Sequence, residues 1–337
     1  MKKIILFYFI AVLLSCNQED KKTERSYKKT GSIERLDPLL DSIIDAGATP
    51  EIIAEGFEWS EGPVWVESQK MLLFSDVPRD TIYKWTEEKG KEVYLTPSGY
   101  TDTIPRGGEM GSNGLTLDKN GNLVLCQCGN RQIARMDAPL DKPAAKYISL
   151  ANSYDGKKFN SPNDVVFNKS GEIFFTDPPY GLEKQMDDPK KETQYQGVYR
   201  VRTDGKVTLI TDSLTRPNGI AFFPDGASLL VANSDPDKPN WYLYYTGAGD
   251  TMIRPRIFYS AAGADKKLKG LPDGMKIDSK GNVFASGPGG IWIFNSDAKL
   301  LGKIKLDEAA SNVALSGDEK TIYITNDMQV LRFKMRK

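Results

Sequence analysis

The residues best suited to chemistry in this sequence are two acidic and four amide side chains that each begin a similar short segment. The six segments are Glu61-Gly-Pro-Val-Trp, Asn113-Gly-Leu-Thr-Leu, Asn163-Asp-Val-Val-Phe, Asn218-Gly-Ile-Ala-Phe, Asp273-Gly-Met-Lys-Ile and Asn312-Val-Ala-Leu-Ser. If their first residues converge, carboxylate and amide oxygens would form an all-oxygen site, which suits calcium better than zinc. Asn-Gly and Asp-Gly pairs are also ordinary turn formers, but Glu is a poor turn residue, so turns alone do not explain Glu61.

The chain contains no histidine among its 337 residues. This excludes Ser-His-Asp and Cys-His catalysis and histidine-rich zinc sites. Catalysis must therefore use carboxylates, amides, Lys, Tyr, Arg, Cys or a metal held by oxygen. Lys+Arg and Asp+Glu each number 45, so the formal net charge is zero. Without a basic excess or a nucleic-acid motif, we expect no nucleic-acid partner.

The elements that would position these residues recur roughly every 40–55 residues, the usual period of a propeller blade. Each polar-led segment is followed by a turn and a second apolar strand, such as Met71-Leu-Leu-Phe-Ser-Asp76, and then by a third, such as Thr81-Ile-Tyr-Lys-Trp85. We therefore predict an all-β, six-bladed β-propeller over residues 51–337, with the first strand of each blade along the central channel. Only three strands fit after Asn312, so Glu51-Ile-Ile-Ala54 is expected to supply the fourth and close the ring.

The N-terminus has the pattern of a lipoprotein signal peptide over residues 1–16. Lys2 and Lys3 precede a short apolar run that is too short to span a bilayer comfortably, and Leu13-Leu-Ser-Cys16 resembles a lipobox. We expect lipidation of Cys16 and a lipid-anchored bacterial lipoprotein, periplasmic or associated with the outer membrane. The alternative is a plain signal peptide with an incidental cysteine.

Residues 17–30 are rich in Lys, Glu and Asp and predict a flexible linker. Within residues 31–50, Asp37-Pro38 is a good helix start and apolar residues follow at helical spacing, so a short helix is expected. Cys126 and Cys128 lie two apart on a predicted strand, where a disulfide would be strained, and packed free thiols are expected over a metal or redox pair.

These motifs resemble the gluconolactonase/regucalcin family, also called the senescence marker protein or SGL family, of calcium-dependent six-bladed β-propellers. The resemblance runs from about residue 51 to the C-terminus. It rests on Glu61-Gly-Pro-Val-Trp, Ser112-Asn-Gly-Leu-Thr, Ser161-Pro-Asn-Asp-Val-Val, Thr176-Asp-Pro-Pro-Tyr-Gly, Arg216-Pro-Asn-Gly-Ile-Ala and Leu271-Pro-Asp-Gly-Met. It implies Glu61, Asn163, Asn218 and Asp273 as metal ligands, Asp273 also as the catalytic acid/base, and Asn113 as a substrate contact.

On this basis we expect calcium-dependent hydrolysis of a sugar lactone or similar cyclic ester by a monomer. A bound metal would polarise the carbonyl while Asp273 accepts a proton from water, and Asn113 and Asn163 could hydrogen-bond the substrate. The alternatives are hydrolysis of an organophosphate or phosphotriester, and a non-catalytic surface module that binds glycan-derived ligands.

Three further side chains have open roles at this stage. Arg131, like Arg106, could recognise a carboxylate or phosphate, or could simply be solvated. Tyr180 could contact substrate as part of a lid, or could pack within its turn. Many relatives have a His-Gly-Asn-Arg stretch where this chain has Cys128-Gly-Asn-Arg131, which puts substrate handling by that histidine in doubt here.

Overall fold

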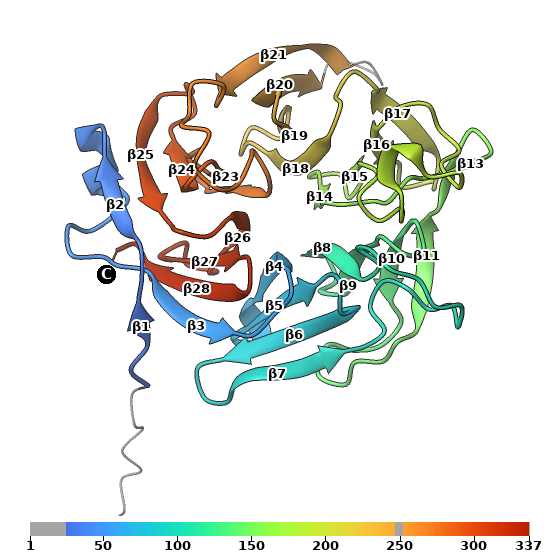
Figure 1. Cartoon of the computed structure of the whole chain (residues 1–337), viewed down its shortest axis with the longest axis horizontal. Coiled ribbons are helices and arrows are strands. Elements are labelled where there is room, and N and C mark those ends of the chain that lie inside the picture. The colour runs from blue at the N-terminus through green and yellow to red at the C-terminus, as the bar shows by residue number, and fades with distance from the viewer. Residues whose placement is uncertain (1–24, 247–251, 337) are drawn as a thin grey trace, which may run out of the picture.

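The computed structural model describes residues 25–246 and 252–336, and Figure 1 shows six antiparallel sheets arranged in a ring around a central axis. The sheets follow one another around the ring in chain order, and the first strand of each lies nearest the axis. This confirms the predicted six-bladed β-propeller. Cys16, the predicted signal peptide and most of the predicted linker lie outside the described residues.

The first three blades each contain four strands, numbered outward from the axis. Blade 1 contains β4 (Ser60–Val66), β5 (Met71–Asp76), β6 (Thr81–Thr86) and β7 (Gly90–Leu95). Blade 2 contains β8 (Ser112–Leu117), β9 (Leu123–Gln127), β10 (Gln132–Met136) and β11 (Tyr147–Ala151). Blade 3 contains β14 (Val165–Phe167), β15 (Ile173–Asp177), β16 (Gly197–Val201) and β17 (Val207–Thr211). A small hairpin of β12 (Ser153–Tyr154) and β13 (Lys157–Lys158) joins blades 2 and 3.

Two of the other three blades are widened by N-terminal strands. Blade 4 contains β18 (Pro217–Phe222), β19 (Ser228–Asp235), β20 (Lys238–Thr246) and β21 (Met252–Ser260). Blade 5 contains β22 (Met275–Ile277), β23 (Val283–Gly287), β24 (Gly290–Phe294), β25 (Leu300–Lys305) and β2 (Ser32–Arg35). Blade 6 contains β26 (Ala310–Leu315), β27 (Thr321–Asn326), β28 (Gln329–Lys334), β3 (Glu51–Glu55) and β1 (Lys28–Lys29).

The ring is closed by pairing between the two ends of the propeller. Strand β3 lies antiparallel to β28, with Glu55 opposite Gln329 and Glu51 opposite Arg332. The Arg332 guanidinium also lies 2.7 Å from the Glu51 carboxylate. The predicted closure of the last blade by an N-terminal strand is confirmed. Strand β1, at the end of the range expected as linker, adds a further edge to the same sheet.

The short helix expected in residues 31–50 is a 3-10 helix, η1 (Pro38–Ser42). Its N-cap is Asp37, whose carboxylate accepts a hydrogen bond of 2.9 Å from the backbone N–H of Leu39. Leu40, on this helix, is fully buried against a core cluster shared by blades 5 and 6. The N-terminal segment therefore packs on the outside of these two blades, where β2 also pairs with β25.

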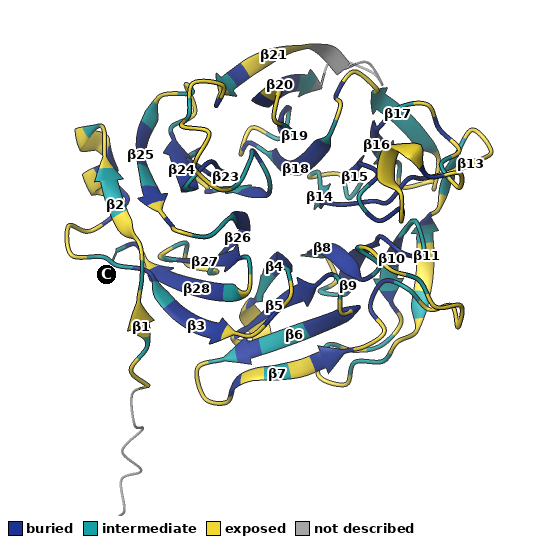
Figure 2. Ribbon diagram, viewed as in Figure 1, coloured by how far each residue is buried: buried dark blue, intermediate teal, exposed yellow. Residues whose placement is uncertain are grey.

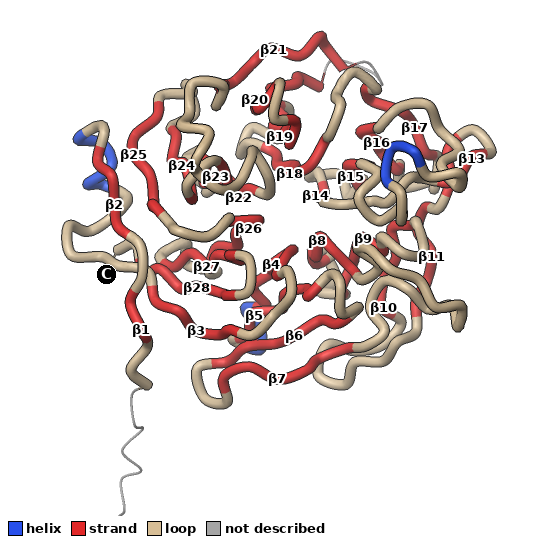
Figure 3. The backbone as a smooth tube through the Cα atoms, viewed as in Figure 1, coloured by secondary structure: helices blue, strands red, loops and turns tan. Residues whose placement is uncertain are grey.

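The hydrophobic core lies between neighbouring blades, because each blade packs its faces against those of the next. Figure 2 shows buried residues along the inner and middle strands, with exposure concentrated at outer edges and loops. Figure 3 shows strands and connecting loops around the ring; in the described residues the other short helices are η2 (Glu67–Gln69) and η3 (Gln185–Asp187). Within the described ranges, none of the helices has the length and apolar character needed to cross a bilayer.

Candidate active site

A cavity of about 350 Å³ lies at the end of the ring where the inner strands begin. Its lining includes five of the six strand-leading residues, together with Tyr180. These lining residues are Glu61, Asn113, Asn163, Asn218, Asp273 and Tyr180. Side chains separated by more than two hundred residues in the sequence thus meet in one cup, which is the convergence that the repeat predicts.

The glycine after the leading residue is explained by contact between neighbouring inner strands. A Cβ atom at Gly62 would lie 2.0 Å from the carbonyl oxygen of Asn113, and one at Gly219 would lie 2.3 Å from that of Asp273. The backbone N–H of Gly114 also donates a 2.7 Å hydrogen bond to the carbonyl of Asn163. The Asn-Gly and Asp-Gly pairs therefore mark close contact between blades around the axis, and not simple turns.

Blades 3 and 6 have larger residues, Asp164 and Asn312, at the position that glycine occupies in the other four. Both fold back onto the next backbone N–H, with hydrogen bonds of 2.9 Å from Val165 to Asp164 and 2.8 Å from Val313 to Asn312. The backbone N–H of Gly274 donates to the carbonyl of Ser311, as that of Gly114 does to Asn163. The sixth leading residue is therefore Ser311, and the sequence-based assignment of Asn312 is wrong by one position.

This shift gives Asn312 a different role from the one expected of it. Its side chain hydrogen-bonds the carboxylates of both Glu61 and Asp164. Since its Oδ1 accepts from Val313, its amide N–H groups are the donors to these two carboxylates. Asn312 thus holds Glu61 in place from beneath the cup.

The cup concentrates negative charge in a buried setting. Burial raises the pKa of Glu61 to about 8, and the charges of Asp164 and Glu109 add to the effect of burial. Burial also raises the pKa of Asp273 well above its ordinary value, with further contributions from Glu61, Asp164 and Glu109. Without a cation, these groups disfavour one another's ionised forms.

Several oxygen atoms of the cup are left available for a ligand, although Oε2 of Glu61 accepts a 2.9 Å hydrogen bond from the backbone N–H of Gly62. Oδ1 of Asp273 is buried and has no hydrogen-bond partner among the described residues. The Asn218 amide nitrogen donates a 3.0 Å hydrogen bond to Ser234, and this contact turns its carbonyl oxygen away from Ser234. In the described part of the chain, the Asn113 and Asn163 side chains make no hydrogen bond to another residue, although Asn163 is only 3 % exposed.

This donor set fits a hard divalent cation on three grounds: the orphaned Asp273 oxygen, the repelling carboxylates and the free amide oxygens. The cup would bind a cation with only two carboxylates, because its other candidate ligands are amides. Across the described ranges, no group of three or more Asp, Glu or Cys side chains is placed to hold a metal. The candidate ligands are instead two carboxylates, Glu61 and Asp273, and two amides, Asn163 and Asn218.

Two charged residues of the cup were not predicted from the sequence. Glu109 lies in the loop between blades 1 and 2, where no repeat points to it, and burial raises its pKa to about 7. Arg216 immediately precedes the Pro217-Asn218 start of blade 4, so its place beside a leading residue could have identified it. Its guanidinium makes no side-chain hydrogen bond to the residues that the structure describes.

Of the two other side chains proposed from the sequence as substrate contacts, Tyr180 lines the cup and Arg131 does not. Tyr180 lines the cup and its hydroxyl hydrogen-bonds Ser234, so it lies at the site and also packs within it. Arg131 is not among the lining residues: its Nε donates a 2.5 Å hydrogen bond to the carbonyl of Phe159 and its Nη1 a 3.0 Å bond to that of Lys190. The structure therefore gives Arg131 a role in holding loops together, and we do not retain it as a substrate ligand.

Cys128 and Cys126 are buried free thiols, as expected from their spacing. Burial raises the pKa of both thiols well above the ordinary range. The Cys128 thiol lies 3.4 Å from the carbonyl of Pro162, directly before Asn163. Cys128 therefore packs behind the cup and does not line it.

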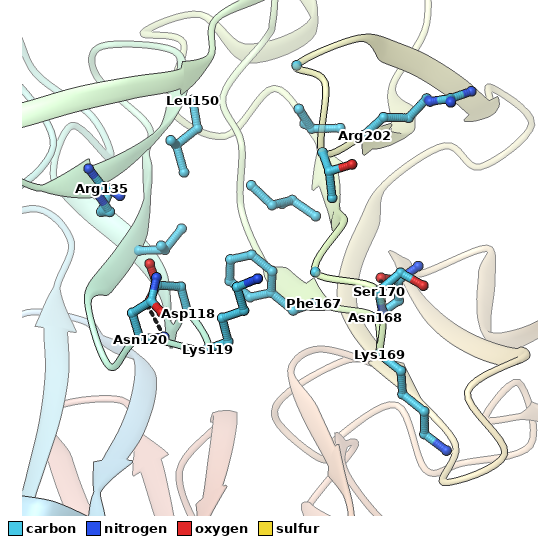
Figure 4. Close-up of a pocket in the computed structure, with 16 residues that line it drawn as sticks. Asp118, Lys119, Asn120, Arg135, Leu150, Phe167, Asn168, Lys169, Ser170 and Arg202 are labelled. Carbon is cyan, nitrogen blue, oxygen red and sulfur yellow. Dashed lines mark hydrogen bonds between the residues drawn. The ribbon is translucent and has the colours of Figure 1, made fainter.

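A second cavity of about 430 Å³ lies between blades 2 and 3, at the opposite ends of their inner strands (Figure 4). Its lining combines apolar side chains such as Leu150 and Phe167 with the turn that contains Asp118. Oδ1 of Asp118 accepts hydrogen bonds of 2.8 Å and 2.9 Å from the backbone N–H groups of Asn120 and Asn122. This cavity contains none of the strand-leading residues.

Comparison with known proteins places this site in context. The chain is 40 % identical over 316 residues to a gluconolactonase of Zymomonas mobilis, covering 91 % of this chain and 86 % of the relative. It is 24 % identical to the pentonolactonase XacC of Haloferax volcanii, over 79 % of this chain and 80 % of that one. Among solved structures, a gluconolactonase from Xanthomonas campestris superposes with a TM-score of 0.78 at 27 % identity, covering 93 % and 99 % of the two chains.

A structure of regucalcin from Agrobacterium tumefaciens, described as a calcium-binding protein, shares the fold with a TM-score of 0.64 at 16 % identity, covering 86 % of this chain and 95 % of that one. Residues 59–327 match the family described as SMP-30/Gluconolactonase/LRE-like region. That range contains all five strand-leading residues of the cup. The chain therefore belongs to the SMP-30/gluconolactonase family of six-bladed β-propellers.

Proposed function

We propose that this protein is a calcium-dependent lactonase that opens a sugar-derived lactone in the cup at the mouth of the propeller. The observation that carries the proposal is the convergence of Glu61, Asn163, Asn218 and Asp273 in one cavity, where a buried oxygen of Asp273 has no hydrogen-bond partner among the described residues. The gluconolactonase and pentonolactonase relatives support the reaction class. The metal-dependent step is supported by the all-oxygen donor set.

Glu61, Asn163, Asn218 and Asp273 would hold the cation. A divalent cation there would polarise the lactone carbonyl and favour the ionised form of the neighbouring carboxylates. Asp273, once ionised, can accept a proton from the attacking water while the water oxygen forms a bond to the carbonyl carbon. The ring C–O bond then breaks, the leaving oxygen takes up a proton, and a hydroxy acid is released.

The remaining residues of the cup would bind and orient the substrate. Asn113 and Arg216 can donate hydrogen bonds to lactone hydroxyls or to the developing oxyanion. Tyr180 closes one side of the cavity, where its hydroxyl is fixed by Ser234. Asn312 does not line the cup and would act indirectly, by holding the Glu61 carboxylate in position.

The test is a pH-stat assay of the mature protein on a panel of aldonolactones, with calcium and with a chelator. We expect turnover with calcium, loss of turnover on chelation and recovery when calcium is added back. A protein that fails to hydrolyse the whole panel with calcium present would rule out the proposed reaction. Turnover that survives complete chelation would instead rule out the metal.

We further propose that the protein is exported and held at the membrane as a monomer through a lipid on Cys16. The lipobox ending at that cysteine supports this, although it lies outside the described residues. Metabolic labelling with radioactive palmitate should mark the wild-type protein and not a Cys16→Ser variant. Equal labelling of the two proteins would contradict the proposal.

A further inference from the structure

A third cavity, of about 450 Å³, adjoins the cup through two shared side chains. Glu109 and Tyr180 line both spaces, so each forms part of the boundary between them. Beyond this boundary most of the lining comes from the loop between blades 1 and 2 and from the loop after β15, and Glu58 and Pro78 complete it. A ligand that fills the cup and projects past Glu109 would enter this neighbouring cavity.

The two loops that enclose the neighbouring cavity are tied to each other. The Arg106 guanidinium donates to the carbonyls of Gly129, at 3.3 Å, and Gly181. The backbone N–H of Gly107 donates a 3.2 Å hydrogen bond to the Glu183 carboxylate. These contacts fix the walls before a ligand arrives, so less ordering entropy is lost on binding.

The lining of this cavity combines hydrogen-bond acceptors with apolar surface. Three carboxylates, those of Glu58, Glu109 and Glu183, accompany Pro78, Met110 and Leu182. Carboxylates accept hydrogen bonds from hydroxyl groups, and apolar side chains can cover the C–H face of a sugar ring. Within the described part of the chain, no Lys or Arg lines this cavity, although Arg79 lies 3.8 Å from Glu58 and Lys190 lies 3.6 Å from Glu183. Glu109 has no ion pair among the described residues, so an anionic group would meet its unpaired carboxylate.

We infer that the neighbouring cavity is a subsite for a second, uncharged sugar ring, and that the preferred substrate is the lactone of an oxidised disaccharide. This inference rests on the proposed lactonase function and adds the substrate class. Each cavity falls within the range of about 300–1,000 Å³ usual for ligand sites, so each has room for one ring. The carboxylate of Glu109, with two oxygens, can accept hydrogen bonds from both rings.

The direct test compares kcat/KM for cellobionolactone and gluconolactone on the calcium-loaded, full-length protein. We expect the disaccharide lactone to be favoured by about tenfold, which corresponds to ~1.4 kcal/mol of transition-state binding. A lactone with a phosphate in place of the second sugar should be a poorer substrate than gluconolactone. Hydrolysis of gluconolactone with no advantage for cellobionolactone would overturn the subsite and leave the proposed function intact.

A Gly107→Trp variant should obstruct the subsite alone. Gly107 lines the cavity, its Cβ direction is open, and its φ lies outside the left-handed region, so a larger residue fits the backbone. The variant should lose the advantage of cellobionolactone while its rate on gluconolactone stays within about twofold. Gly47→Trp, at another open glycine on the N-terminal segment, is the matched control and should change neither rate. Equal losses on both lactones in Gly107→Trp would contradict the inference.

Binding of the product acids tests the subsite independently of turnover. In calorimetry on the calcium-loaded protein, cellobionate should bind about tenfold more tightly than gluconate. Gly107→Trp should abolish this difference and Gly47→Trp should preserve it. Equal affinities in the wild-type protein would overturn the subsite even if both lactones are hydrolysed, whereas failure to hydrolyse either lactone would overturn the proposed function.

Discussion

The cup and the cavity between blades 2 and 3 have similar volumes, but their carboxylates differ in how many hydrogen bonds they accept. In the cavity of Figure 4, the Asp118 carboxylate accepts hydrogen bonds from Asn120 and Asn122. Burial there raises the pKa of Asp118, but the hydrogen bonds from Asn122 and Asn120 outweigh it and the net pKa is lowered. In the cup, by contrast, Asp273 has a buried oxygen without a partner and Glu61 has a raised pKa.

Cavity volume alone therefore does not identify a functional site in this fold. In the cavity between blades 2 and 3, the Asp118 carboxylate is satisfied by its own turn. A buried carboxylate oxygen without a partner is costly, so a ligand that completes its coordination would stabilise it. In the cup, the buried Asp273 oxygen without a partner shares one cavity with Asn113 and Asn163, whose side chains make no hydrogen bond to the described residues, so the comparison can be tested by substitution on each side.

The largest effect is expected from Asp273→Asn, which keeps the shape of the cup but removes the proposed base. Lactone turnover should fall by about 10²–10⁴-fold, the usual contribution of a general base. The measurement is kcat by pH-stat, with calcium binding followed by calorimetry to show that the metal is still held at saturating concentration. A variant that keeps more than a tenth of wild-type kcat would remove Asp273 from the chemistry.

The next effect concerns the stability of the metal-free protein as a function of pH. Because folding raises the pKa of Glu61 from about 4.5 to about 8, the folded state holds more protons than the unfolded state between these values. The free energy of unfolding should therefore fall by roughly 2–5 kcal/mol as pH rises from 5 to 8. Calcium, which binds the ionised carboxylates, should reverse this loss.

Thermal unfolding at pH 5, 6.5 and 8, with chelator and with calcium, measures this dependence. The Glu61→Gln variant is the control, since it lacks the titrating group and should show a flatter profile in chelator. A metal-free wild-type protein whose melting temperature rises over this pH range would contradict the assigned burial of negative charge in the cup.

A smaller effect is expected from Asn312→Ala, which removes the donor that holds Glu61 from below. Loss of a group that orients a metal ligand typically weakens affinity by about 10–100-fold, so calcium binding should weaken to that extent. Asn295→Ala is the matched control, because Asn295 accepts hydrogen bonds of 3.1 Å and 2.9 Å only within its own turn. Equal calcium affinities in the two variants would show that Asn312 does not support the site.

The smallest effect is expected on the other side of the comparison. Asp118→Ala removes the carboxylate that accepts hydrogen bonds within the turn beside the cavity of Figure 4. The free energy of unfolding should fall by about 1 kcal/mol for each hydrogen bond lost. Lactone turnover should stay within twofold of wild type, as measured in the same pH-stat assay. A large loss of lactone turnover with an unchanged calcium affinity would show that the cavity beside Asp118 affects catalysis in the cup.

Most of the fold and much of the cup could be predicted from the sequence. Sequence repeats indicate the blades because every blade packs against its neighbours in the same way and therefore has a similar strand pattern. The N-terminal contribution to blade 6 followed from the shortage of strands after Asn312. The additional edge strands β1 and β2 carry no such signal, because they are two and four residues long and lack clear alternation.

The assignment in blade 6 failed for an identifiable reason. In four blades, glycine marks the position after the leading residue, whereas in blade 6 that position holds Asn312. Because the register of β26 shifts between Ala310 and Asn312, the strand pattern alone does not show which residue faces the cup. The sequence pattern therefore points to Asn312 as the leading residue, one position after Ser311, which the structure places there.

The six-fold repeat, the oxygen-rich leading residues and the exclusion of histidine chemistry follow directly from the amino-acid sequence, since they depend on residue types and on strand periodicity along the chain. The roles of Arg131, Glu109 and Asn312 become visible only when the blades pack together. The partners of these side chains come from other blades or loops, and sequence distance does not predict such contacts. The Asp273 oxygen without a partner is likewise a property of the closed ring, because burial exists only after all six blades have met.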